Sequence, residues 1–398
     1  MTMRIQAVFR WLFSVALVTT LAAQNKTVAD LPLEESFRGI AFVSGSVNAG
    51  ARLGFLVDTG ASSSSVSREV AEKLGVPMLH GRASASGNRM LQVEVIPQAS
   101  IALGDATVAG QVVALPLDTL EPIFGRQIDG IVGGDLMRQY VAEFDYERKH
   151  IRFYAREGFR YSGRGAELPL VIHHNIPYVE LTVGLPNGQR VHGRFMIDSG
   201  AGGSALQIYK PIADRNGWLS GLKTVVETGY GVGGATHHAA TRAAEVDIGP
   251  YHLARPTVAF TEDYDETRVP PGATGLMGVE ILRRFRVTYD YANRHMYLEP
   301  NGRLNEPFIR DASGLRLRAA APEFRRPFVE KVAEDSAAAR AGIQPGDVLL
   351  AIDAFSADDL PLNQLRALLY APGEAHQLKL RRKDKTLELM LNTRDLLP

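Results

Sequence analysis

Two short motifs each place a carboxylate at the end of an apolar run. Residues 55–61 read FLVDTGA and residues 195–201 read FMIDSGA, so Asp58 and Asp198 are each followed by a hydroxyl residue, glycine and alanine. Burying an ionised aspartate at the end of an apolar strand costs free energy unless another group compensates its charge. We therefore expect the two aspartates to act as a pair.

Paired carboxylates support acid-base chemistry on water. Because two like charges side by side cannot both ionise, one proton is shared; one aspartate activates a water molecule while the other, protonated, polarises a substrate carbonyl. We expect Thr59 and Ser199 to hydrogen-bond across the interface between the motifs. Gly60 and Gly200 leave room for backbone amides to reach the carboxylates. This chemistry needs no metal or cofactor, and it predicts a rate profile that leans toward acid.

The two motifs belong to a longer internal repeat, whose matching landmarks are Gly104 with Gly249, Gly133 with Gly278, and Asp145 with Asp290. In both copies 29 residues separate the first landmark from the second, and 12 separate the second from the third. Only the stretch after the motif aspartate differs, at 46 residues against 51. Ordered matches with preserved spacing indicate a duplicated domain of about 130 residues.

The repeat is expected to be mainly β, because its segments are short, β-branched or aromatic, and broken by glycine, proline and asparagine. Helical signals are few: one runs from Ser67 to Leu74 and ends at Gly75, and one runs from Leu206 to Arg215. The two aspartates would then sit where strands end and the chain turns. Residues 156–167, polar and glycine-containing, are the expected connection between the copies.

On these motifs the chain resembles an aspartic protease of the retropepsin and pepsin superfamily over roughly residues 37–301. The resemblance implies two fused acid-protease β-barrel lobes, at 37–156 and 165–301, related by a pseudo-twofold axis, with Asp58 and Asp198 as catalytic residues. It also implies that the strands ending at Gly133 and Gly278 pack under the catalytic loops.

The family closes a β-hairpin flap over its substrate. The corresponding regions are residues 227–234 in the second copy and 83–88 in the first, and either or both are candidates. Tyr230 is a candidate flap residue, or simply a tyrosine packed at a turn.

Two other patterns point to functions that their context does not support. Gly229, Gly231 and Gly234 match a dinucleotide-binding fingerprint, but no helix is expected to follow them. The neighbouring histidines at 173–174 and 237–238 would point to opposite faces of a strand, so we assign no metal site.

The C-terminal region, residues 312–396, is expected to form a small α+β domain. The stretch from Gly342 to Asp353, GIQPGDVLLAID, resembles a PDZ domain of the bacterial periplasmic-protease type. That family binds an extended C-terminal peptide by strand addition, with the terminal carboxylate held by loop amides. By position this loop would be Gly314, Leu315, Arg316 and Leu317, a shortened version of the family pattern. The alternative is a domain that merely packs on the protease.

Composition and the N-terminus limit the remaining possibilities. At roughly 150 residues per domain, 398 residues predict two or three domains. Lys plus Arg and Asp plus Glu both total 44, so no basic field favours nucleic acid, and the absence of cysteine excludes thiol catalysis. Residues 1–23 have the charge and apolar pattern of a signal peptide, with an uncleaved membrane anchor as the alternative.

These observations predict an exported, periplasmic or secreted, aspartic endopeptidase that acts on polypeptides, with a PDZ domain for polypeptide or C-terminus recognition. We expect a monomer with pseudo-twofold lobes, although fused lobes that still dimerise are a further possibility. The alternative from another class is a catalytically silent binding or scaffold protein with the same folds.

Overall fold

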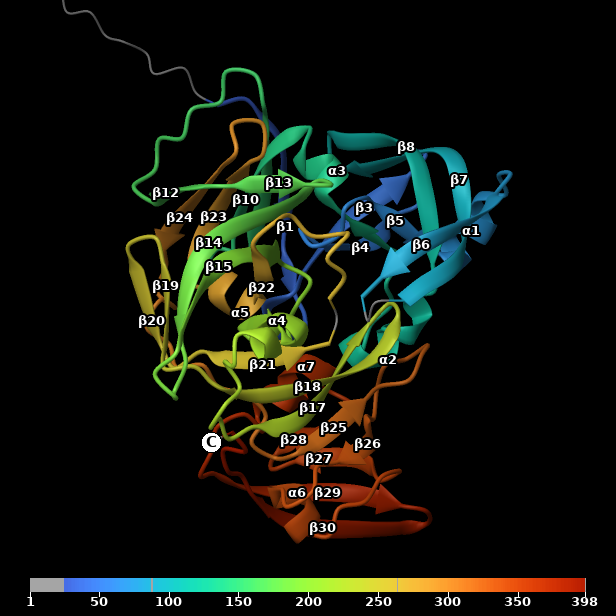
Figure 1. Ribbon diagram of the computed structural model, residues 1–398. Coiled ribbons are helices and arrows are strands. Elements are labelled where there is room, and N and C mark those ends of the chain that lie inside the picture. The colour runs from blue at the N-terminus through green and yellow to red at the C-terminus, as the bar shows by residue number, and fades with distance from the viewer. Residues whose placement is uncertain (1–24, 87–88, 263, 398) are drawn as a thin grey trace, which may run out of the picture.

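The computed structural model describes residues 25–86, 89–262 and 264–397 (Figure 1). The expected signal peptide, residues 1–23, lies outside them. Strands dominate the chain, which confirms the prediction of a mainly β protein. Within the described ranges no helix is both long and apolar enough to cross a bilayer.

The first lobe is built on one sheet, with the strand order β2-β3-β4-β9-β5-β8-β7-β6. Asp58 follows β4, whose neighbours are β3, antiparallel, and β9, parallel. The strands are β2 (Glu34–Glu35), β3 (Ala41–Val47), β4 (Leu53–Val57), β5 (Ser65–Ser67), β6 (Leu79–Ala85), β7 (Arg89–Leu103), β8 (Ala106–Leu115) and β9 (Gly130–Val132).

The second lobe has a sheet with the order β17-β18-β21-β16-β22-β15-β14-β19-β20, and β13 pairs with β14. Asp198 is the last residue of β15. The strands are β13 (Val171–His173), β14 (Ile176–Gly184), β15 (Arg190–Asp198), β16 (Leu206–Tyr209), β17 (Val225–Gly231), β18 (Gly234–Arg242), β19 (Glu245–Ile248), β20 (Tyr251–Ala254), β21 (Thr257–Thr261) and β22 (Ala273–Gly278).

The two sheets share one connectivity. The path β3-β4-β9-β5-β8-β7-β6 in the first lobe corresponds to β14-β15-β22-β16-β21-β18-β17 in the second. The directions also agree: β4 is parallel to β9 as β15 is to β22, and β5 is parallel to β8 as β16 is to β21. The two aspartates therefore occupy equivalent positions in equivalent sheets.

A further sheet, β1-β11-β10-β23-β24-β12, joins the lobes. At its centre β10 pairs with β23, so that one strand from each repeat meets along the pseudo-twofold axis. Strand β1 lies before residue 37, where the first lobe was expected to begin, and pairs with β11. The strands are β1 (Thr27–Pro32), β10 (Tyr140–Asp145), β11 (His150–Ala155), β12 (Ala166–Pro169), β23 (Phe285–Asp290) and β24 (His295–Pro300).

Helices are short and lie at the ends of strands. The predicted helix before Gly75 is α1; the Ser67 side chain caps its N-terminus and Gly75, at φ 62°, ends it. The prediction of a helix from Leu206 is wrong for its first four residues, which form β16. That segment pairs with both β21 and β22, and these tertiary hydrogen bonds override local helix propensity. The two lobes contain α1 (Arg68–Leu74), α2 (Glu121–Phe124), α3 (Gly134–Met137), α4 (Lys210–Arg215), α5 (Val279–Leu282), and the 3-10 turns η1 (Phe37–Gly39) and η2 (Leu117–Thr119).

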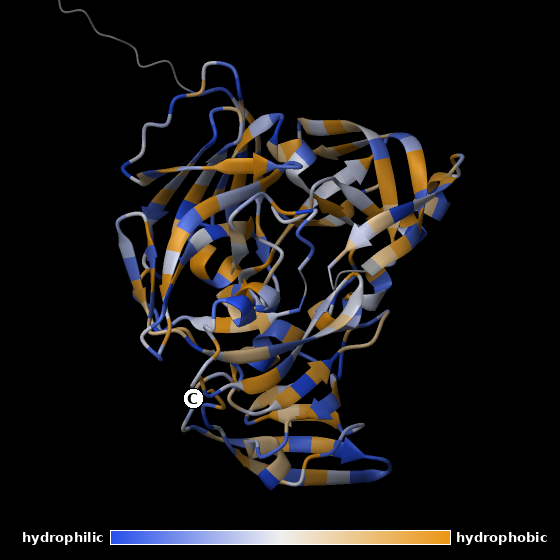
Figure 2. Ribbon diagram, viewed as in Figure 1, coloured by the Kyte–Doolittle hydropathy of each residue, from blue (hydrophilic) through white to orange (hydrophobic). Residues whose placement is uncertain are grey.

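The C-terminal region forms a small α+β domain below the lobes in Figure 1, with a hydrophobic core of its own. Its sheet runs β25-β26-β27-β29-β30, which leaves β25 at an edge. Buried and exposed residues alternate along β29, and Figure 2 shows that hydrophilic and hydrophobic residues are interspersed along the strands of this domain. The elements are β25 (Leu315–Arg318), β26 (Phe328–Val332), α6 (Ala337–Arg340), β27 (Val348–Ile352), β28 (Phe355–Ser356), α7 (Leu362–Ala367), β29 (Ala375–Arg382) and β30 (Lys385–Asn392).

The core of the lobes determines where the aspartates point. In β15, Phe195 and Ile197 are fully buried, whereas Met196 and Asp198 are partly exposed. Because side chains alternate along a strand, the face that carries Asp198 is opposite the face that packs into the core.

Replacing Gly275 by alanine tests the packing between β22, the neighbour of β15 in the sheet, and β16. A Cβ atom at Gly275 in β22 would lie 1.9 Å from the carbonyl oxygen of Gln207, a backbone atom that has little room to move. We expect Gly275→Ala to lower the free energy of unfolding by about 2 kcal/mol or more, seen as a lower urea midpoint at unchanged slope. The control is Gly203→Ala, because the described structure places no heavy atom within 4 Å of a Cβ there. Equal midpoints for the two variants would contradict the packing described.

Candidate active site

Asp58 and Asp198 stand at the ends of paired central strands. Val57 is in register with Val132 of β9, and Asp198 is in register with Gly278 of β22. The chain then turns back at once, because the amide of Ala61 donates to the carbonyl of Asp58 at 3.3 Å, and Ala201 does the same to Asp198 at 3.3 Å. The two carboxylates thus leave equivalent tight turns.

The threonine and serine that follow exchange hydrogen bonds across the lobes. The Thr59 hydroxyl donates to the carbonyl of Ile197 at 2.7 Å and accepts from the amide of Ser199 at 3.0 Å. Reciprocally, the Ser199 hydroxyl donates to the carbonyl of Val57 at 2.8 Å and accepts from the amide of Thr59 at 3.0 Å. Both side chains are fully buried. Each lobe therefore satisfies the buried polar groups of the other.

This exchange brings the two carboxyl groups together. Each accepts a hydrogen bond from an amide of its own loop, Gly60 to Asp58 at 2.8 Å and Gly200 to Asp198 at 2.9 Å, and the two carboxyls lie close enough to change each other's pKa. A Cβ atom at Gly60 would lie 2.7 Å from the Asp198 carboxyl carbon, and one at Gly200 would lie 2.6 Å from that of Asp58. Only glycine fits at either position.

Burial and mutual repulsion change the ionisation of the pair. Burial, then the negative charge of Asp58, then their shared hydrogen bond raise the pKa of Asp198 well above its ordinary value of 3.8. Burial also raises the pKa of Asp58, against the hydrogen bonds from backbone amides and from Asp198. Both residues nevertheless keep a partly exposed surface. The pair therefore holds one proton over a pH range in which isolated aspartates would both be ionised, and water can reach it.

The two glycines expected to pack under the aspartate loops do lie against them. A Cβ atom at Gly133 would lie 2.6 Å from the carbonyl oxygen of Ala61, and one at Gly278 would lie 2.7 Å from that of Ala201. The same carbonyls accept hydrogen bonds from the amides of Gly134, at 2.8 Å, and Val279, at 2.9 Å.

Sequence reasoning missed an acidic residue that supports each loop. The carboxylate of Asp135 accepts hydrogen bonds from the amide of Ser64 at 2.9 Å and from its hydroxyl at 2.7 Å. In the second lobe Glu280 forms a buried ion pair at 2.7 Å with Arg38, which in turn donates to the carbonyl of Gly203 at 2.8 Å in the segment after Asp198. The signal was present, because each acidic residue lies two positions after the glycine that ends the matching strand, Gly133 or Gly278.

Each lobe contributes a hairpin at the expected flap position, β6–β7 and β17–β18, and the two approach one another in Figure 1. Gly87 and Asn88, part of the first candidate flap, lie outside the described residues. The two hairpins are in contact near their tips. Gly231 lies so close to Ser86 that an added Cβ atom would be 1.7 Å from the Ser86 hydroxyl. Arg268 of the second lobe also donates to the Ser84 hydroxyl of the first hairpin.

Tyr230 lies on the second hairpin, where its hydroxyl accepts a hydrogen bond from Arg316 of the PDZ domain at 2.7 Å. Of the residues expected to form the PDZ carboxylate loop, only Gly314 lies in a loop, at φ 78°. Leu315, Arg316 and Leu317 belong to strand β25 instead.

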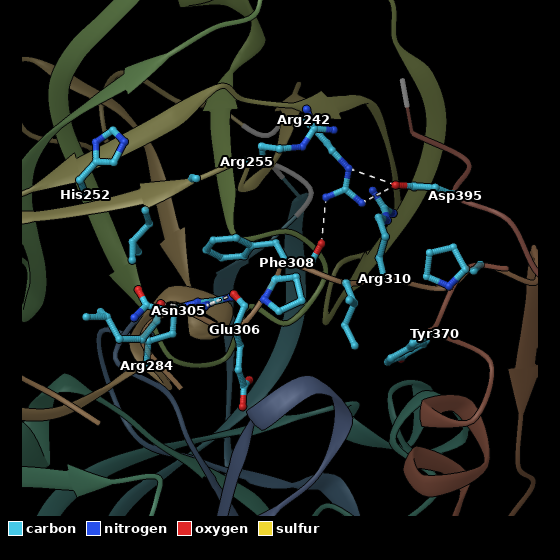
Figure 3. A pocket seen from close by; sticks show the side chains of 17 residues that line it. Arg242, His252, Arg255, Arg284, Asn305, Glu306, Phe308, Arg310, Tyr370 and Asp395 are labelled. Carbon is cyan, nitrogen blue, oxygen red and sulfur yellow. Dashed lines mark hydrogen bonds and ion pairs between the residues drawn. The ribbon is translucent and has the colours of Figure 1, made fainter. Parts of the chain in front are cut away.

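One cavity of the structure lies away from the aspartates. It has a volume of about 500 Å³ and is bounded by the second lobe, residues 304–312 and the C-terminal tail (Figure 3). Neither Asp58 nor Asp198 lines it. Among the residues that the structure describes, no group of three His, Cys, Asp or Glu side chains is placed to hold a metal ion.

Removing the Ser199 hydroxyl should weaken the contact between the lobes. Ser199→Ala leaves the Thr59 amide and the Val57 carbonyl buried without partners, which should lower the free energy of unfolding by about 2–3 kcal/mol. Urea unfolding measures the loss, and Ser199→Thr, which retains the hydroxyl, should recover most of it. Ser220→Ala, at an exposed position, is the control. A stability loss no larger than that of the control would contradict the structural role given to the exchange.

The raised pKa values predict how stability depends on pH. Above the ordinary value of 3.8 the unfolded chain releases a proton that the folded pair retains, so the pair's own contribution to stability should fall as pH rises until the raised pKa of Asp198 is passed. The slope should approach about 1.4 kcal/mol per pH unit per retained proton. We expect a flatter curve for Asp198→Asn when urea unfolding is measured from pH 3 upward. Parallel curves for the two proteins would show that no extra proton is held.

Comparisons with known proteins agree with this geometry. Residues 43–136 match the family model described as aspartyl protease, a range that contains Asp58 and the strand ending at Gly133. Residues 328–382 match the model of the PDZ domain. No curated protein gave a significant match to the chain. These matches agree with the resemblance drawn from the motifs: the chain contains an aspartyl protease domain, matched within the first lobe, and a C-terminal PDZ domain.

Proposed function

We propose that this protein is an exported aspartic endopeptidase in which one chain supplies both catalytic carboxylates. One observation carries the proposal: Asp58 and Asp198 meet where two equivalent loops face each other, each carboxyl lying against the glycine of the opposite loop, and both remain partly exposed. A pair of carboxyls that holds one proton has both a general base and a general acid within reach of one water molecule.

The mechanism follows from this shared proton. The ionised carboxylate takes a proton from water as the water oxygen attacks the carbonyl carbon of the substrate peptide bond. The protonated carboxyl donates its proton to the carbonyl oxygen, which gives a neutral tetrahedral diol. Collapse of the diol returns a proton from the diol hydroxyl to one carboxylate and delivers a proton from the pair to the departing amine. The C–N bond then breaks, and the pair is left with one proton, as at the start.

The surrounding residues have positioning roles in this scheme. The amides of Gly60 and Gly200 orient one oxygen of each carboxyl, which leaves the remaining lone pairs directed toward water and substrate. Thr59 and Ser199 fix the distance between the two loops. The paired hairpins are suited to cover a bound polypeptide, and they must separate to admit one because their tips are in contact.

The remaining features of the proposal concern location and substrate. Residues 1–23 support export to the periplasm or beyond, with retention as a membrane anchor as the alternative. Polypeptides are the proposed substrates, and the presence of a PDZ domain supports peptide recognition in general.

Substitution of either aspartate tests the activity directly. We expect Asp58→Asn and Asp198→Asn each to reduce casein cleavage by about 10²- to 10⁴-fold, because each removes an acid or base that the other cannot replace. The control is Asp105→Asn, at an exposed turn between β7 and β8. Cleavage should be measured from acid to neutral pH, since one proton must remain on the pair. Equal, background-level cleavage by the wild type and both variants would favour a binding or scaffold protein instead.

A further inference from the structure

The hairpin β17–β18 of the second lobe is attached to the PDZ domain near its tip. Besides accepting the hydrogen bond from Arg316, the Tyr230 ring lies under two guanidinium groups, with Arg316 at 5.1 Å and Arg318 at 4.3 Å from the ring centre. Glu330 of β26 holds Arg318 by an ion pair at 2.9 Å. A tyrosine between two fixed cations has both its ring and its hydroxyl engaged.

The base of the same hairpin is attached as well. Arg242, the last residue of β18, pairs with Asp395 of the C-terminal tail at 2.7 Å and donates to the carbonyl of Phe308 at 2.8 Å (Figure 3). Glu227 of β17 pairs with Arg310, in the segment that leads into the PDZ domain. The hairpin therefore contacts the C-terminal part of the chain along its length, whereas β6–β7 has no such contact among the interactions of the described residues.

The first lobe contacts the same edge strand of the PDZ domain, β25, at its C-terminal end. A PDZ ligand adds a strand along the edge that β25 exposes, in the groove beside the helix α7. Here the amide of Ala319 donates to the carbonyl of Pro122 at 3.1 Å, where an added strand would otherwise accept it. The Leu317 carbonyl accepts from Arg366 of α7, whose other nitrogen donates to the carbonyl of Ile123 at 2.6 Å.

Packing agrees with these hydrogen bonds. Helix α2, which contains Pro122 and Ile123, packs on β25, and Gly125 ends that helix directly against α7. A Cβ atom at Gly125 would lie 2.7 Å from the Cβ of Leu362. The chain thus supplies its own segment at the end of the groove where a peptide would continue.

The amides that would hold a ligand carboxylate are also engaged. The carboxylate of Asp311 accepts hydrogen bonds from the amides of Ser313 at 3.1 Å and Gly314 at 2.8 Å. The Ser313 hydroxyl accepts from the amide of Leu315 at 3.0 Å. An internal carboxylate therefore occupies the loop.

From these contacts we infer that the PDZ domain is an internal latch of the protease, which holds α2 of the first lobe at the end of its groove and clamps the β17–β18 hairpin of the second. Opening of that hairpin requires release of the Tyr230 contacts. The regulatory meaning of the latch rests on the proposed function, because the hairpin controls access to the aspartates only if they act on a substrate. The contacts themselves do not depend on catalysis.

Hydrogen exchange on the full-length chain tests the clamp without any need for activity. In Tyr230→Leu the two cation-π contacts and the hydrogen bond are lost, so amides of residues 225–242 should exchange roughly five- to tenfold faster than in the wild type. Lys331→Gln is the matched control, because it removes an exposed cation from the strand beside Arg316. If the hairpin exchanges at the same rate in Tyr230→Leu and the control, the latch is excluded. If the hairpin amides exchange faster in Tyr230→Leu but the wild type cleaves no substrate, the latch is supported and the proposed protease function is refuted.

A second measurement tests the occupied groove. A fluorescent hexapeptide with an apolar residue at its free C-terminus is added to the full-length chain, up to about 0.1 mM. We expect either no change in anisotropy, or binding that accelerates amide exchange in residues 119–125 because the peptide displaces α2. Binding that protects β25 while α2 exchanges as before would show an open groove and overturn the inference.

Discussion

The reciprocal hydrogen bonds between Thr59 and Ser199 are the constraint on which the site depends. Each hydroxyl donates to a strand carbonyl of the other lobe and accepts from the other motif's amide, so neither loop is satisfied alone. Because these groups are fully buried, separation of the lobes would leave polar atoms without partners, which costs free energy. Separation would also break the hydrogen bonds between β10 and β23, which raises that cost. The distance between the two aspartates is therefore set by the lobe interface rather than by the aspartates themselves.

That fixed distance has an electrostatic consequence. Two carboxyls held this close together repel each other when both are ionised, and each accepts a hydrogen bond from a backbone amide of its own loop, Gly60 or Gly200. These donors do not offset burial, so the pKa values of both aspartates rise and the pair retains a proton. The requirement for glycine at both positions has the same origin, since each glycine faces the carboxyl of the opposite lobe. The same arrangement that lowers stability at higher pH supplies the acid and base of the proposed reaction.

Much of the site could be predicted because its information is local and repeated. A motif of four residues, the apolar run before each aspartate, and the equal spacing between the later glycines of the repeat were enough to place Asp58 and Asp198 at strand ends. The helical prediction from Leu206 was wrong because pairing with β21 and β22 lies far away in sequence. For the same reason sequence reasoning gave Tyr230 no partner. Its contact with Arg316 joins segments 86 residues apart, and no local sequence pattern in either segment predicts contact with the other.

The central claim is that one chain supplies both carboxylates of the pair. Mixing purified Asp58→Asn with Asp198→Asn tests it most directly, because each variant retains one intact aspartate in a different lobe. If the pair forms within a chain, the mixture should cleave casein no faster than either variant alone, while the wild type cleaves at a rate proportional to its concentration. Recovery of cleavage on mixing would show that lobes from different chains form the site, and would contradict the account.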